Sequence, residues 1–97
     1  MVGDTYTQFE VAIGIGSYME IKPSAGTEVI LHNVFHADSV GLRMVEGSDE
    51  AAFYEEAGKG LLTNMYFHIT NTQFLRIYNM GSGVQNMAID GIVSKEP

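Results

Sequence analysis

The sequence contains no cysteine and only two prolines among its 97 residues. Without cysteine, the chain can form neither a disulfide framework nor a metal site built on thiolates. The compartment in which the protein works therefore cannot be deduced from redox chemistry. Two prolines are too few for a proline-rich linker, whereas eleven glycines allow many tight turns.

Basic residues are scarce as well. The chain has five lysines and arginines against 12 aspartates and glutamates, which gives a formal charge of −7. Nucleic acids and anionic membranes both require clustered positive charge on a protein that binds them. The five basic residues do not cluster, so we expect neither nucleic acid nor a membrane as a partner. They are Lys22, Arg43, Lys59, Arg76 and Lys95.

Long apolar runs are also missing. No stretch approaches the roughly 20 apolar residues that a membrane-spanning helix needs. The first residues, M-V-G-D-T-Y, contain neither the basic nor the apolar segment of a signal peptide. We therefore expect a soluble protein that is made without a conventional export signal.

What the chain does contain is a series of short apolar runs between turn-forming residues. Apolar residues make up 45% of a length that suits one domain with a single core. Residues 65–94 hold three runs rich in β-branched and aromatic residues, separated at 71–72 and at 80–83. This pattern is typical of consecutive antiparallel strands. Alternation here directs Met65, Phe67, Ile69, Met87, Ile89 and Val93 inward, and Gly91 indicates a bulge or a close backbone approach.

The first half predicts further strands. Residues 8–13 alternate, with Phe9, Val11 and Ile13 on one side, and residues 18–22 alternate again. Residues 27–36 are apolar on both faces, as expected of a strand that is covered on both sides. The polar residues 1–7 form either a frayed end or an N-terminal arm that orders against a partner.

The middle of the chain is harder to interpret. Residues 40–45 read as a strand that ends in a turn at 46–49. In residues 50–58, a helix competes with a strand because alanine and glutamate favour helices, and we expect a short strand around 52–55. A further turn is expected at 58–60.

These runs amount to about eight short strands joined by closely spaced turns. The predicted fold is all-β: a single compact antiparallel β-sandwich, jelly-roll-like, that spans residues 1–97. Strand order is not visible in the sequence, so jelly-roll and immunoglobulin-like topologies both remain open.

Candidate metal ligands are few. His32 and His36 lie four apart in one predicted strand and so on one face, and His68 on a neighbouring strand could complete a three-histidine site. A cupin-type site, however, requires two histidines spaced by two positions together with a carboxylate. An acidic cluster could bind calcium, but its spacing matches no EF-hand loop. It comprises Glu46, Asp49, Glu50, Glu55 and Glu56.

Catalytic motifs are similarly weak. The glycine-rich segments 14–17 and 80–83 resemble parts of phosphate-binding loops, yet neither is followed by Gly-Lys-Ser/Thr or by a predicted helix. The chain shows no nucleophile elbow and no carboxylate pair that stands out. We therefore expect a binding or structural protein rather than an enzyme, with no cofactor and no metal.

The block F-H-I-T-N-T-Q-F-L-R-I-Y-N-M-G-S-G-V-Q-N-M-A-I-D-G-I-V resembles the closing strands of small β-sandwich decoration, or cement, proteins of tailed-phage virions. The middle segments T-E-V-I-L-H-N-V, G-L-R-M-V-E-G-S-D and G-K-G-L-L are compatible with the same layout. The resemblance implies a protein on the capsid exterior, assembled in the host cytoplasm. It also implies the major capsid protein as partner and a homo-oligomer, with a trimer favoured.

Outward aromatic residues are the candidate contacts with that partner, because tyrosine and arginine contribute disproportionately to interface energy. They are Tyr18, Tyr54, Tyr66, Arg76 and Tyr78. A tyrosine on a strand can equally be a cross-strand packing partner. Two other function classes stay open: a receptor- or glycan-binding module of a viral spike or fibre, and a small cupin-type enzyme.

Overall fold

The computed structural model describes residues 1–58, 60–63 and 65–97. Within these ranges the chain forms nine strands and no helix, and hence no helix that could span a membrane. The strands are β1 (Thr5–Ile13), β2 (Tyr18–Ile21), β3 (Glu28–His36), β4 (Val40–Glu46), β5 (Asp49–Glu56), β6 (Gly60–Leu62), β7 (Phe67–Ile69), β8 (Gln73–Asn79) and β9 (Gln85–Lys95).

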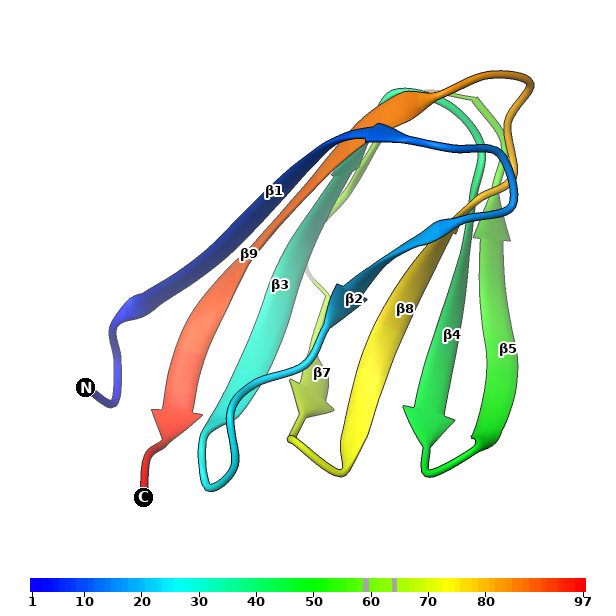
Figure 1. Cartoon of the computed structure of the whole chain (residues 1–97). Coiled ribbons are helices and arrows are strands. Elements are labelled where there is room, and N and C mark those ends of the chain that lie inside the picture. The colour runs from blue at the N-terminus through cyan, green and yellow to red at the C-terminus, as the bar shows by residue number, and fades with distance from the viewer. Residues whose placement is uncertain (59, 64) are drawn as a thin grey trace.

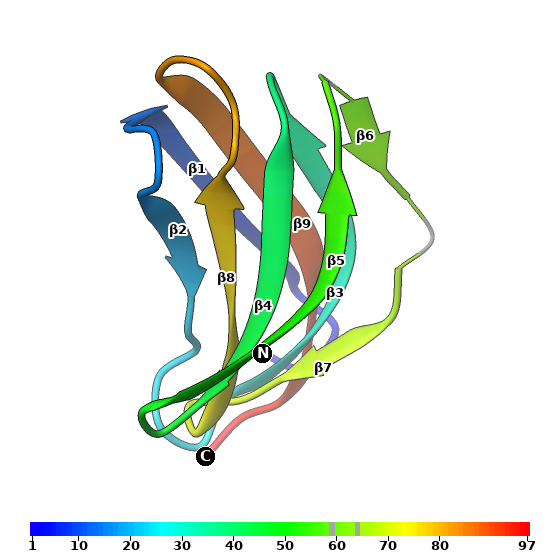
Figure 2. The ribbon, with the colours of Figure 1, turned by 90° about the vertical axis from the view of Figure 1, so that its right-hand side faces the viewer.

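Two antiparallel sheets face each other and form a β-sandwich (Figure 1). The five-stranded sheet has the order β1-β9-β3-β6, with β7 also paired to β3. The four-stranded sheet has the order β2-β8-β4-β5. β6 pairs with the end of β3 and β7 with its beginning, so these two short strands share one edge (Figure 2). Counted as one interrupted strand, they reduce nine strands to eight in the jelly-roll order, which confirms the jelly-roll-like prediction.

The core lies between the sheets and is built mainly from alternate residues of β2, β3, β4, β8 and β9. Met19 and Ile21 of β2, predicted from alternation, are fully buried. So are Leu75 and Ile77 of β8. The buried cluster consists of Ile13, Met19, Ile21, Val29, Leu31, Val34, Val40, Leu42, Ile69, Leu75, Ile77, Met87 and Ile89. Met65 and Phe67, which we also expected to point inward, are partly buried and pack against this cluster.

The alternation predicted for β1 is wrong. Phe9 and Val11 are exposed, whereas Ile13 is buried. The cause is a bulge between Glu10 and Ile13, where β1 has one residue more than β9 and Ala12 adopts a positive φ of 53°. An extra residue reverses which face of the sheet the following side chains occupy. Phe9 therefore points to solvent, although the pattern predicted a core residue.

The prediction for β3 is wrong in one respect. Its inner face, with Val29, Leu31 and Val34, is fully buried as expected. Its outer face is not covered by the described chain, and 40% of Phe35 is exposed. The second apolar face of this strand is therefore left uncovered by the part of the chain that the structure describes.

The N-terminal residues are more ordered than an arm. Residues 5–7 belong to β1 and pair with β9, so the arm expected over residues 1–7 does not extend past Asp4. The segment 50–58, in which a helix competed, forms β5, which is longer than the strand expected at 52–55. The turn expected at 58–60 includes Lys59, which lies outside the described residues.

Gly91 has the close backbone contact that its position suggested. A Cβ atom at this residue would lie 2.3 Å from the carbonyl oxygen of Ile30 and 3.0 Å from Cα of Leu31. The pairing of β3 with β9 shifts register next to this point, between Leu31 and Asn33. Glycine is thus required where β9 crosses the bulge in β3.

Candidate functional site

The outer face of the four-stranded sheet carries an aromatic–arginine cluster, which we define as Tyr18, Arg43, Glu50, Arg76 and Tyr78. Sheet register brings these residues together from four strands. Tyr18 of β2 pairs with Tyr78 of β8, and Arg43 of β4 pairs with Arg76 of β8. Three of the five predicted contact residues, Tyr18, Arg76 and Tyr78, thus lie side by side.

Aromatic rings and guanidinium groups alternate within the cluster. The rings of Tyr18 and Tyr78 are 5.0 Å apart and tilted by 48°. The Arg76 guanidinium lies 4.5 Å from the centre of the Tyr18 ring, and that of Arg43 lies 4.2 Å from the centre of the Tyr78 ring. Each of the two rings thus already has one guanidinium partner within the sheet.

Glu50 of β5 pairs with both arginines, and Glu20 of β2 pairs with Arg76 as well, at 3.1 Å. One carboxylate oxygen accepts hydrogen bonds from Arg76 and from the Tyr78 hydroxyl, the latter at 2.7 Å, and the other accepts one from Arg43 at 3.1 Å. The Tyr78 hydrogen bond, aided by the arginines, lowers the pKa of Glu50 below its ordinary 4.5. Burial and the bond to Glu50 raise the pKa of Tyr78 above 10.0. With Glu20 included, the two arginines of the cluster have two carboxylate partners.

The other two predicted contact residues lie elsewhere. Tyr54 is 44% exposed and donates a hydrogen bond to Glu56. Tyr66 is 72% exposed, and its ring lies edge-on to His32 at 6.5 Å. Neither contacts the aromatic–arginine cluster in the described part of the chain. Sequence alternation could not separate these tyrosines from Tyr18, because all of them lie in β-rich segments.

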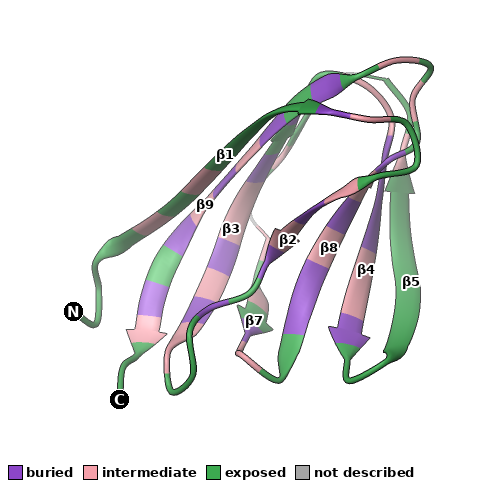
Figure 3. Cartoon of the chain, in the orientation of Figure 1, coloured by how far each residue is buried: buried purple, intermediate pink, exposed green. Residues whose placement is uncertain are grey.

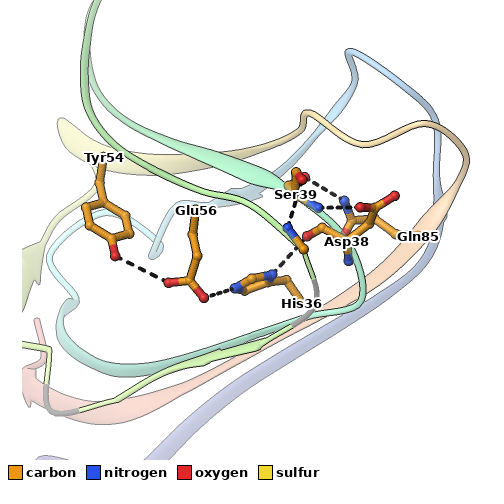
Figure 4. A network of polar contacts seen from close by, with 7 residues as sticks. His36, Asp38, Ser39, Tyr54, Glu56 and Gln85 are labelled. Atoms are coloured by element: carbon orange, nitrogen blue, oxygen red, sulfur yellow. Dashed lines mark hydrogen bonds and ion pairs between the residues drawn. The ribbon is translucent and has the colours of Figure 1, made fainter.

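His36 connects the two sheets at one end of the sandwich (Figure 4). Its Nδ1 lies 2.9 Å from the carbonyl oxygen of Asp38, and its Nε2 lies 3.1 Å from the carboxylate of Glu56 on β5. A ring carrying both protons donates to both oxygens. Gln85 extends the network by accepting from the Asp38 amide at 3.0 Å. We interpret the role of His36 as structural, since its side chain is buried and both ring nitrogens already have partners.

The three histidines do not meet. The bulge between Leu31 and Asn33 breaks the alternation that would have put His32 and His36 on one face. His68 instead contacts Glu28, with 2.6 Å between Nε2 and the carboxylate. Among the described residues, no group of three or more histidines and carboxylates is placed to hold a metal ion. The residues of the acidic cluster are spread along β4 and β5, and Glu50 and Glu56 already have partners.

The outer face of the five-stranded sheet differs in kind. It carries what we name the apolar row: Phe9, Ala88, Phe35 and Leu61. Cross-strand register aligns these residues, because Phe9 and Phe35 both pair with Ala88 and Phe35 also pairs with Leu61. The exposed fractions are 67% for Phe9, 40% for Phe35 and 48% for Leu61. The row thus crosses four strands from β1 to β6.

A shallow hollow of about 210 Å³ lies on this row. Ala88 forms its floor, and Phe9 and Phe35 line it from either side. The nearest row toward the termini is polar but paired internally, since Asn33 donates to Asp90 at 2.6 Å. A hollow of this volume has room for one apolar side chain of a partner protein.

Sequence reasoning missed most of the apolar row. The sequence pattern predicts Phe9 on the same side as Ile13, and it predicts that both faces of residues 27–36 are covered. The only signal available was that residues 27–36 are apolar on both faces, which a strand within one small sandwich does not need. A scan against models of known protein families finds no match, and a search of curated proteins finds no significant relative.

Proposed function

We propose that the chain is a structural virion protein, a decoration or cement protein that binds the outer surface of an assembled phage capsid and stabilises it. The identity of the partner, the major capsid protein, rests on the resemblance of the closing strands to such proteins. The jelly-roll fold is compatible with that assignment, since capsid proteins and lectins are among its many users. We infer a binding role without catalysis.

The apolar row is the observation that carries a docking role. Its three large side chains expose roughly 300 Å² of apolar surface in one line, and patches of this size on soluble proteins commonly mark interaction sites. Phe9 and Phe35 flank a hollow, which offers both projecting and receiving elements to a partner. Such fully desolvated aromatic anchors contribute most of the binding energy at interfaces. We therefore assign the capsid contact to this face of the five-stranded sheet.

The acidic remainder of the surface suits late addition to a shell. A net charge of −7 keeps single molecules apart before assembly and disfavours binding to nucleic acid. The apolar row itself carries no charged side chain. Binding through it would leave the carboxylates in water, so binding would not require the free energy of removing their hydration. The trimeric state implied by the resemblance remains part of the same proposal.

The first experiment is mass spectrometry of virus particles that are purified from cells in which this protein is expressed. We expect the protein in a fixed ratio to the major capsid protein, and we expect particles stripped of it to lose heat resistance. Its absence from particles would falsify the proposal.

The second experiment assigns the surface. Stripped particles are incubated with wild-type protein, with the double variant Phe9→Thr and Phe35→Thr, or with a control, Val84→Thr. Val84 is 69% exposed and lies outside the apolar row, so it matches the loss of an exposed apolar side chain. Binding that is lost only in the double variant supports the assignment, and equal binding by all three contradicts it.

A further inference from the structure

The outer edge of β5 is open along the side of the sandwich. β5 pairs with β4 over seven register positions, from Glu46 opposite Asp49 to Val40 opposite Glu56, and the described chain places no strand on its other edge. All its residues are exposed except Glu56, which is half-buried (Figure 3). An open edge presents unpaired backbone N–H and C=O groups to any extended chain that comes alongside.

An apolar groove runs beside this edge. Phe53 and Tyr54 of β5 line one side of it, and Leu62, Met65 and Phe67 from the edge of the five-stranded sheet line the other. The groove has a volume of about 280 Å³. The rings of Phe53 and Phe67 contact each other edge-on, with 5.1 Å between the ring centroids. Figure 2 shows β5 beside β6 and β7 on this side of the molecule. Because Leu62, Met65 and Phe67 pack on the core, an apolar side chain entering the groove would extend that core.

Carboxylates precede and follow Phe53 and Tyr54 along β5. Asp49 and Glu55 are both exposed, near the two ends of β5. Like charges placed opposite each other disfavour pairing between two copies of this edge. The same charges attract a segment that carries lysine or arginine. The edge is therefore protected against self-association while remaining complementary to a basic strand.

We propose that β5 binds an extended segment of a partner protein by strand addition, with one apolar side chain of that segment in the groove and lysine or arginine side chains beside Asp49 and Glu55. Backbone hydrogen bonds to the edge supply affinity, and the groove and the carboxylates supply selectivity. This site lies on a different surface from the apolar row and does not depend on the proposed function.

The experiment uses isotope-labelled full-length protein and nuclear magnetic resonance. The probe is the peptide Lys-Val-Lys-Phe-Lys-Val-Lys. Two matched peptides accompany it: one with glutamate in place of every lysine, and one with alternate backbone nitrogens methylated so that it cannot form a strand ladder. We expect only the unmodified lysine peptide to shift resonances, and to shift them along β5 and around Phe67.

A charge reversal tests the role of the carboxylates. Asp49→Lys combined with Glu55→Lys should weaken the binding of the lysine peptide by about tenfold and allow the glutamate peptide to bind. Glu10→Lys combined with Glu96→Lys makes the same change in net charge away from β5 and should leave binding unchanged. If both double variants weaken the binding of the lysine peptide equally, the attraction is unspecific and the proposal is overturned.

The wild-type measurements decide the question even if the reversed variant does not fold. Shifts centred on another surface, or equal binding by the methylated peptide, would exclude strand addition at β5. Neither outcome bears on capsid binding, because no virus particle enters this experiment.

Discussion

The two outer faces of this sandwich deal with their surroundings in opposite ways. On the four-stranded sheet, Arg43, Arg76 and Glu50 pair with one another and lie against tyrosine rings. On the five-stranded sheet, Phe9 and Phe35 stand over Ala88 with nothing in the described chain to cover them. Charged groups on a flat sheet can form ion pairs with their neighbours. Exposed apolar side chains, in contrast, are removed from water only when another surface binds over them. We therefore expect binding through the outer face of the five-stranded sheet.

The face of the four-stranded sheet holds three of the residues that the sequence predicts as contacts: Tyr18, Arg76 and Tyr78. Tyrosine and arginine are the residues that interfaces favour. Here these residue types lie together and already contact one another and two carboxylates, Glu20 and Glu50. Composition alone thus identifies residues that could bind, and only their mutual contacts decide whether they are already occupied.

The largest expected effect comes from filling the close approach in the five-stranded sheet. Gly91→Ala places a Cβ atom against the Ile30 carbonyl oxygen, and backbone cannot yield as a side chain can. We expect a loss of about 3 kcal/mol in the free energy of unfolding. Gly41→Ala is the matched substitution in the other sheet, where the new atom would meet two flexible side chains, Met80 at 3.3 Å and Glu55 at 3.8 Å. Urea unfolding of both variants measures the difference, and equal losses would contradict it.

The second effect separates binding from stability. We expect Phe9→Thr combined with Phe35→Thr to weaken attachment to capsids by about a hundredfold, because two anchor residues are lost. Both side chains are substantially exposed, so the free energy of unfolding should change by less than about 1 kcal/mol. Sedimentation of particles with bound protein measures the first quantity, and thermal unfolding the second. A large loss of stability with intact attachment would reverse the roles assigned to the two faces.

A smaller effect is expected from the charged face. Glu50→Gln removes the carboxylate that pairs with two arginines and should lower the Tm by a few degrees at neutral pH. The pKa of Glu50 is lowered by folding, so its contribution is present above 4.5 and disappears as the pH falls through the folded-state pKa. Melting curves of both proteins from about pH 7 down to about pH 3 should therefore converge in acid. Attachment to capsids should not change.

The smallest effect appears in alkali. Burial and Glu50 raise the pKa of Tyr78 above 10.0, so folding favours the protonated phenol. The resulting stabilisation is complete below that value and is lost as the pH rises through the folded-state pKa. Tyr78→Phe removes this titration. Wild-type protein should consequently lose more Tm than the variant between about pH 9 and about pH 11, and parallel curves would count against the Tyr78–Glu50 bond.

Much of the fold could be predicted from local pattern. Alternation identified the inward residues of β9, such as Met87 and Ile89, because strand side chains repeat every two residues. It failed at β1, where one extra residue reversed the faces. It also failed for His32 and His36, which a bulge separates. Bulges depend on the partner strand, so a single strand's sequence does not reveal them.

The sequence by itself determined that this chain is all-β, acidic and free of cysteine chemistry, because composition and side-chain alternation are local properties. Only the tertiary structure decided which faces are free. Phe9, Phe35, Leu61 and Ala88 come from four separate parts of the chain, and cross-strand register alone brings them into one row. Register arises from pairing between distant strands, and this is why the apolar row could not be read along the sequence.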